Sequence, residues 1–281
     1  LFLHGFLDHF DYSIFLCFGI FILFSFLEKK KFFRYFILIV IFLIALLNSY
    51  GRIGIISFFL FFPLIIIISK QKNIKYSILS MPIIFGLMSY YIFPPLHNRV
   101  NQTIHSIQLL SSEMSLREKI ENDAVYLSSK NDSLSTEYYR KEIMKNEKWV
   151  ESIKNKEPKY ETSIGQRYLY VKNSLYLINK KPFIGFGASQ FEKVYMKYYP
   201  DLKSIKHPHN NFLFVLVELG ICGLVILLYI FYSQLRLFLI NKDRSMLQLI
   251  LPLYFLWIML FDNYFLNHNT LVFFCLFSFL I

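Results

Sequence analysis

The sequence predicts an all-α polytopic membrane protein, with about seven transmembrane helices and one large helical extracytoplasmic loop. Two observations concern composition: 55% of the 281 residues are hydrophobic and only 17% are charged, and the mean hydropathy is +0.42. A soluble domain usually has about 25% charged residues, and one soluble core of this size cannot bury so much apolar surface. The third observation is that the apolar residues form segments of about 20 residues, the length that crosses a bilayer.

Seven apolar segments are predicted to be membrane helices. Six approach the length of a full span, and the seventh is shorter and ends with the chain. The segments are 11–27, 32–49, 53–69, 75–95, 211–233, 246–265 and 270–281. The chain begins at Leu1 and opens directly in HGFLDHFD, so we expect that it lacks its native N-terminus.

Positive charge predicts the orientation of these spans. Lys and Arg cluster in the connections EKKKFFR and SKQKNIK and in the connection after residue 233, and short basic connections stay in the cytoplasm. The other connections then face the outer side, including the long stretch 96–210. The predicted parts are a bundle of four spans over 1–95, an outer loop over 96–210 and the C-terminal spans over 211–281.

The net charge of +11 is concentrated outside the apolar segments. Residues 96–210 hold 19 Lys or Arg and 13 Asp or Glu. In so apolar a chain we interpret this basic balance as contact with membrane lipids and lipid-linked phosphate, and not with nucleic acid. The three cysteines lie within apolar runs without metal-ligand spacing, so neither a disulfide nor a zinc site is expected. Within the loop, RYLYVKNSLYLINKKP predicts an amphipathic helix that ends at Pro182.

Arg52 is the first candidate functional residue on the outer side. It lies in SYGRIG, where the second span turns into the third. A charge at the membrane boundary is costly unless it meets a partner or a water-filled cavity. Binding of a ligand and snorkelling of the side chain to lipid headgroups are both compatible with this position.

A second candidate is the segment KHPHNNFL, which precedes the fifth span. His207 and His209 are spaced to point the same way on an extended segment, and Asn210 and Asn211 are placed to cap the following helix. A neutral imidazole can accept a proton from a sugar hydroxyl. The alternative is a capping turn with surface histidines. We expect no metal here, because no acidic residue or cysteine stands nearby at a suitable spacing.

Arg167 is the third candidate, at the start of the amphipathic helix. A guanidinium group binds two phosphate oxygens at once, although a solvated helix residue is the simpler interpretation. No GxSxG motif, Gly-rich phosphate loop or DxD-type nucleotide-sugar site is present in the sequence.

Taken in order, these segments resemble the Wzy_C or O-antigen ligase family of membrane proteins. The resemblance covers about residues 40–230 and rests on SYGRIGI, on Arg167 leading a helix that ends in a P-x-x-G-x-G turn, and on H-x-HN before a span with E-x-G-x-x-G. The matching residues are Arg52, Arg167, Pro182, Gly185, Gly187, His207, His209, Asn210, Glu218, Gly220 and Gly223.

The resemblance implies glycosyl transfer on the periplasmic side of the bacterial inner membrane. The donor would be an undecaprenyl-diphosphate-linked glycan and the acceptor lipid A-core oligosaccharide or another glycan, with no cofactor, nucleotide sugar or metal. Arg52 and Arg167 would bind the diphosphate, and His209 would be the catalytic residue that orients or deprotonates the acceptor hydroxyl. The alternatives are an O-antigen polymerase, a protein O-oligosaccharyltransferase using the same donor, and a non-enzymatic transporter of the lipid-linked glycan.

Overall fold

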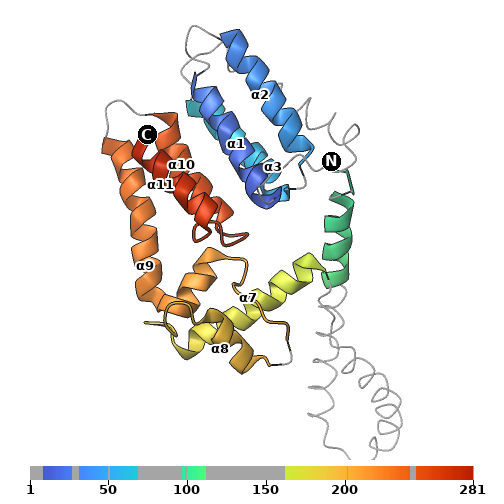
Figure 1. The fold of residues 1–281 in the computed structure, drawn as a ribbon, viewed down its shortest axis with the longest axis vertical. Coiled ribbons are helices and arrows are strands. Elements are labelled where there is room, and N and C mark those ends of the chain that lie inside the picture. The colour runs from blue at the N-terminus through green and yellow to red at the C-terminus, as the bar shows by residue number, and fades with distance from the viewer. Residues whose placement is uncertain are drawn as a thin grey trace, which may run out of the picture. The chain divides into compact units, whose positions relative to one another are not determined.

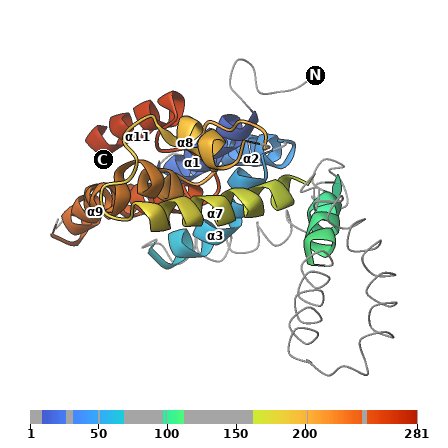
Figure 2. The same ribbon diagram turned by 90° about the horizontal axis from the view of Figure 1, so that it is seen from below.

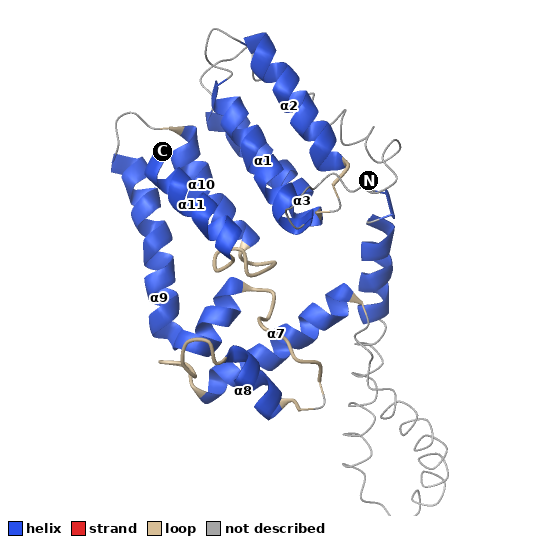
Figure 3. Cartoon of the chain, viewed as in Figure 1, coloured by secondary structure: helices blue, strands red, loops and turns tan. Residues whose placement is uncertain are grey.

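The computed structural model describes residues 9–26, 32–49, 51–68, 97–98, 100–111, 162–200, 202–240 and 245–280. All regular elements within these ranges are helices, as Figure 3 shows, which confirms the all-α prediction for them. The predicted span 75–95 lies outside the described residues. The number of membrane spans therefore stays a prediction.

The chain divides into two units. The first contains Leu1–Val100 and Tyr170–Ile281, and the second contains Asn101–Leu169. The sequence-based division into 1–95, 96–210 and 211–281 remains a prediction, but residues 170–210 belong to the same unit as the apolar helices.

The first three helices match the first three predicted spans. They are α1 (His9–Phe26), α2 (Phe32–Leu47) and α3 (Arg52–Ile68). Both α2 and α3 pack against α1, and the three helices lie together in Figures 1 and 2. Gly54 permits this packing, because a Cβ there would lie 2.4 Å from the carbonyl oxygen of Ser13 in α1.

The C-terminal helices are α9 (Asn211–Ile240), α10 (Met246–Ile258) and α11 (His268–Leu280). Phe274 of α11 joins them, because its ring contacts Phe231 of α9 and Phe255 of α10. The prediction of a span over 246–265 was wrong at its end, since α10 stops at Ile258 and turns follow it. Polar residues in these turns are hydrogen-bonded to the start of α9, as described below.

Helix α10 connects the two groups of helices and runs antiparallel to α3. The hydroxyl of Tyr254 donates to the carbonyl of Ile14 at 3.0 Å, and the indole of Trp257 donates to Ser57 at 3.1 Å. Tyr254 lies one turn before Trp257 in α10, and its ring contacts Phe61, which lies one turn after Ser57 in α3. The end of α10 therefore lies beside the beginning of α3.

Apolar side chains are exposed on several of these helices as well as buried between them. Such residues on α2, α3 and α9 include Ile41, Leu60, Val225, Ile226 and Leu237, with 48–66% of their surface exposed. A helix that is apolar on all sides is typical of a protein surrounded by lipid. Among the described residues, α9 is the one helix long and apolar enough to cross a membrane, and five other apolar helices are shorter.

Helix α9 is broken at Gly220, where φ is +64° and ψ is −162°. A short segment before Gly220 meets a longer one over 221–240, and the bend is visible in Figure 1. The longer segment has about the 20 residues that a bilayer requires. The predicted span 211–233 therefore corresponds to two helical segments that continue to Ile240.

The predicted amphipathic helix is α7 (Ser163–Lys180), and it is followed by α8 (Phe191–Tyr198). Two of its residues, Asn173 and Leu177, face a small core that contains Tyr195 of α8. The amide of Asn173 donates to the hydroxyl of Tyr195 at 2.9 Å. This contact fixes the second half of α7 against α8.

Candidate active site

Polar residues gather at one end of the helices of the first unit. Arg52 begins α3 at this end, five residues before Ser57, which accepts a hydrogen bond from Trp257 near the end of α10. At the start of α11, the amide of Asn269 donates to the carboxylate of Asp11 in the first turn of α1, at 3.4 Å. The starts of α1, α3 and α11 and the end of α10 thus lie together.

Asn211 holds the connection 259–267 against the start of α9. Its backbone N–H donates to the carbonyl of Met259 at 2.9 Å, and its side-chain amide donates to Asn263 at 2.6 Å. Its side-chain oxygen accepts from the backbone N–H of Phe265 at 3.0 Å. Because Asn211 is fully buried, these three bonds replace the water that its polar atoms have lost.

Asn210 caps α9 as the sequence predicts. Its side-chain oxygen accepts from the backbone N–H of Leu213 at 3.0 Å, which satisfies one of the free donors in the first turn. Its amide nitrogen donates to the carbonyl of Leu260 at 3.0 Å. The residue next to His209 is therefore fixed to both α9 and the connection.

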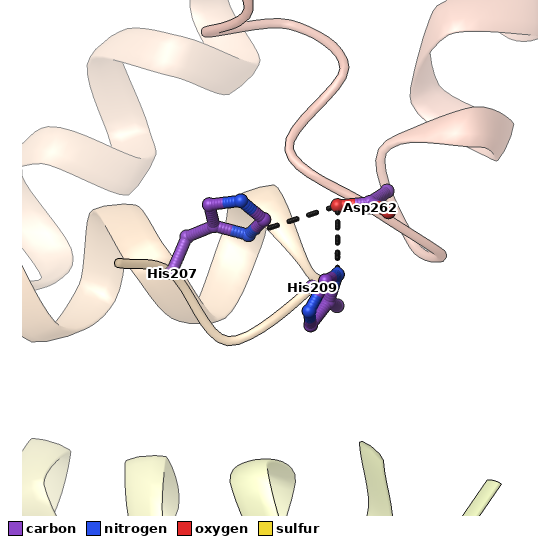
Figure 4. A group of neighbouring side chains, drawn as sticks. All are labelled: His207, His209 and Asp262. Atoms are coloured by element: carbon purple, nitrogen blue, oxygen red, sulfur yellow. Dashed lines mark hydrogen bonds and ion pairs between the residues drawn. The ribbon is translucent and has the colours of Figure 1, made fainter. Parts of the chain in front are cut away.

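His207 and His209 both point toward Asp262, which comes from the connection after α10 (Figure 4). Nδ1 of His209 lies 3.0 Å from Oδ1 of Asp262, and Nδ1 of His207 lies 3.7 Å from the same oxygen. The two imidazole rings meet edge to face, with their centroids 4.7 Å apart. The segment between them is not fully extended, because His209 has a φ of +53°.

The surroundings of Asp262 keep it ionised. Burial raises the pKa of its carboxyl group, but the hydrogen bond from His209, the charges of both histidines and the backbone N–H of Asn263 outweigh burial and leave the pKa below its ordinary value. A carboxylate accepts hydrogen bonds and donates none. Nδ1 of neutral His209 therefore carries the proton, and its Nε2 has a free lone pair.

The surroundings of His207 favour its neutral form. Burial lowers its pKa, as do the positive charges of His209 and Lys206, and the opposing effect of Asp262 is smaller. Its Nδ1 is buried and makes no hydrogen bond in the described part of the chain.

Tyr170 packs against His209 from α7. The two rings are nearly parallel, at 22°, with their centroids 5.9 Å apart. Tyr170 also contacts the ring of Tyr195, which Asn173 holds in place. The imidazole of His209 is thus fixed by a carboxylate at one nitrogen and by an aromatic ring on its face.

The structure brings together some of the residues that the sequence singled out. His207 and His209 share one carboxylate, and Arg52 lies at the same end of the helices. Arg167 lies in the first turns of α7 and belongs to the second unit, so the structure does not place it relative to the histidines. The roles of Arg52, Arg167 and His209 remain proposals.

Sequence reasoning missed Asp262 and Tyr170 as neighbours of His209. Asp262 is 53 residues away in the sequence, so no local motif contains both. The one available signal was the predicted topology, which places the connection DNYFLNHN on the same side as HPHN. With Asp262 included, the site contains the acidic ligand whose absence argued against metal binding.

The Gly-containing turn after α7 and the break in α9 are paired through their backbones. Phe186 and Gly187 donate to the carbonyls of Val217 and Glu218 at 2.9 and 2.8 Å. In the opposite direction, the N–H groups that follow the break donate back to the turn: Ile221 to Pro182 and Cys222 to Phe183, at 2.8 and 3.2 Å. The turn thus satisfies backbone groups that the broken helix leaves without partners.

Glu218 completes this pairing. Its carboxylate accepts from the backbone N–H of Phe191 at the start of α8, at 3.0 Å, and the residue is 7% exposed. Glu218 is thus bound to the start of α8, whereas Asp262 lies in the connection after α10.

Comparison with known proteins agrees with the sequence resemblance. The family model Wzy_C, described as O-antigen ligase, matches residues 37–228. The match contains Arg52, Arg167, His207 and His209, and ends before Asp262. Members of this family are integral membrane proteins and glycosyltransferases of the O-antigen ligase and polymerase type. No curated protein sequence matches the chain.

Proposed function

Because the chain belongs to the O-antigen ligase family, we propose that it transfers a glycan from undecaprenyl diphosphate to lipid A-core oligosaccharide. The reaction takes place on the periplasmic side of the bacterial inner membrane. The observation that carries this proposal is the 3.0 Å contact between His209 and Asp262 at the polar end of the helices.

His209 acts as the general base in this proposal. Nδ1 donates its proton to Asp262 in a hydrogen bond, which leaves the lone pair of Nε2 to accept a proton. The acceptor hydroxyl loses its proton to Nε2 as its oxygen attacks the anomeric carbon of the donor sugar. The bond from that carbon to the diphosphate oxygen breaks, and undecaprenyl diphosphate leaves.

Asp262 is a positioning residue in this scheme. It fixes the tautomer of His209 and stabilises the imidazolium that forms when Nε2 takes the proton. Tyr170 holds the plane of the ring through its stacking contact. Both effects reduce the reorganisation that the base needs during the reaction.

Arg52 and Arg167 bind the diphosphate of the donor. Negative charge grows on the leaving diphosphate as the glycosidic bond breaks, and fixed guanidinium groups stabilise it. Arg52 is half-buried at the same end of the helices as Asp262, which supports its share of this role. Two guanidinium groups supply the positive charge that Mg²⁺ provides in other phosphate sites, so the transfer needs no metal.

The experiment that tests this function uses a strain from which the gene is deleted. Loss of all glycan-capped lipopolysaccharide, with accumulation of lipid-linked polymer, supports the ligase. Lipopolysaccharide capped with a single repeat would instead indicate a polymerase, and unchanged lipopolysaccharide with loss of protein glycosylation would indicate a protein O-oligosaccharyltransferase.

Complementation with variants then tests the site. We expect that His209→Ala, Arg52→Ala and Arg167→Ala fail to restore capping at normal membrane levels of the protein. His268→Gln is the matched control, because His268 is exposed at the start of α11 and lies outside the His207, His209 and Asp262 cluster. Full capping by any of the three alanine variants removes that residue from the proposed site.

A further inference from the structure

Three side chains with metal-binding chemistry meet in the candidate active site. One donor atom from each of His207, His209 and Asp262 lies within 4.8 Å of the other two (Figure 4). Ligand atoms around a tetrahedral Zn²⁺ lie about 3.3 Å from one another. Small rotations of the three side chains would therefore surround one cation. Two imidazoles with one carboxylate suit a transition-metal cation, whereas Mg²⁺ and Ca²⁺ prefer ligand sets made of oxygen.

His207 provides a second and independent observation. Its Nδ1 is buried and has no hydrogen-bond partner in the described part of the chain. Oδ1 of Asp262 lies 3.7 Å away, which is beyond hydrogen-bond distance. Buried polar atoms in proteins almost always have a partner. A cation between this nitrogen and the carboxylate would provide the missing contact.

We propose that His207, His209 and Asp262 bind a divalent transition-metal cation such as Zn²⁺, and that this cation blocks proton transfer by His209. The inhibitory part of the proposal rests on the proposed function. Zn²⁺ needs no other protein ligand here, because water can complete its coordination.

Inhibition follows from the proton count of the imidazole ring. Neutral imidazole carries one proton, on either Nδ1 or Nε2. A cation bound to Nδ1 takes the lone pair there, so the single proton of His209 must lie on Nε2. With its proton on Nε2, His209 is a donor and cannot accept the proton of the acceptor hydroxyl.

Metal binding can be measured without activity. The untagged full chain, reconstituted in nanodiscs, is titrated with Zn²⁺ by calorimetry, and we expect one site. His207→Gln should weaken the affinity by at least about 100-fold, since it removes a direct ligand, and Asp262→Asn should do the same. His268→Gln should bind as the original chain does. Unchanged Zn²⁺ affinity in both His207→Gln and Asp262→Asn overturns the site.

A measurement on the unaltered chain covers the case in which the variants fail to fold. Co²⁺ in a tetrahedral site of nitrogen and oxygen ligands absorbs visible light strongly, whereas the hydrated ion absorbs weakly. The strong spectrum, lost when Zn²⁺ is added, supports the site. A spectrum identical to that of hydrated Co²⁺ overturns it.

The inhibitory part is tested by glycan transfer in the same nanodiscs. Zn²⁺ should abolish transfer at concentrations that fill the site, and a chelator should restore it. Binding with full activity overturns the inhibition. A chain that binds Zn²⁺ at this site but transfers no glycan even in chelator contradicts the proposed function and leaves the metal site standing.

Discussion

Asp262 accepts a hydrogen bond from Nδ1 of His209 at 3.0 Å, although 53 residues separate the two in the sequence. The bond joins the segment before α9 to the connection after α10, and Asn211 strengthens the same junction with three further hydrogen bonds. A side chain that accepts a proton during catalysis needs this kind of fixed surrounding.

Asp262→Asn should reduce kcat for glycan transfer by about 10²- to 10⁴-fold. The amide of asparagine can donate to Nδ1 of His209, which would favour the tautomer with its proton on Nε2. The KM for the lipid-linked donor should change little, because Asp262 does not contact the donor in our proposal. Steady-state kinetics on the purified protein measures both constants.

The matched control for Asp262 is Glu192→Gln. This variant also removes one carboxylate charge, but from the exposed face of α8. It should retain activity. General-base catalysis contributes far more than a twofold change in rate. If the kcat of Asp262→Asn stays within about twofold of the original value, Asp262 does not position His209.

Tyr170 is expected to act through its ring and not through its hydroxyl. Tyr170→Phe keeps the stacking on His209, so its kcat should stay within about threefold of the original value. Tyr170→Leu removes the stacking and should lower kcat about tenfold, which corresponds to the energy of one aromatic contact. Circular dichroism would establish that both variants keep their helices. Equal kcat values for the phenylalanine and leucine variants would contradict a role for the stacked ring.

The thermal stability of the protein should fall as the pH is lowered below 6.5. The pKa of His207 in the folded chain lies below its ordinary value of 6.5, so between the two values the unfolded chain binds more protons. Unfolding is then favoured as the pH falls through this window. The pKa of Asp262 is also lowered, from 3.8, so the stability that it contributes above this value is lost at still lower pH.

His207→Gln should flatten this dependence. The melting temperature, measured in detergent between pH 6.5 and about 5, should change less in the variant than in the original chain. His268→Gln is the control and should keep the original slope. A slope that is the same in all three proteins would show that His207 does not cause it.

Gly220→Ala should destabilise the protein more than Gly187→Ala does. Both glycines have a positive φ, +64° and +107°, so alanine is strained at either position. At Gly220 the new Cβ would also lie 2.3 Å from the carbonyl oxygen of Phe183, whereas at Gly187 the nearest atom, in Gln190, is 3.5 Å away.

The expected loss for Gly187→Ala is about 1–3 kcal/mol in the free energy of unfolding. For Gly220→Ala we expect a loss above about 4 kcal/mol or failure to accumulate in the membrane. Chemical denaturation in detergent, with membrane yield as a second measure, compares the two. Equal losses of stability in the two variants would contradict close packing of the turn 182–187 against Gly220.

The sequence alone determined the class of the protein and most of its helices. Apolar segments of about the length of a bilayer predicted α1, α2, α3, α9 and α10, and a shorter apolar segment predicted α11. The family resemblance is confirmed over residues 37–228. These features are visible without a structure because helix formation and membrane insertion depend on residues that are close together in the chain. The Asn210 cap was predicted for the same reason.

Only the tertiary structure decided which groups surround His209. Asp262 and Tyr170 reach it from separate elements, and the break at Gly220 needs the turn of residues 182–187 as its partner. The apolar pattern predicted that 246–265 would be one helix, but α10 ends at Ile258, and Asn263 in the turns that follow accepts a hydrogen bond from Asn211. Such contacts depend on how helices pack, and a single sequence records the residues but not their neighbours in space.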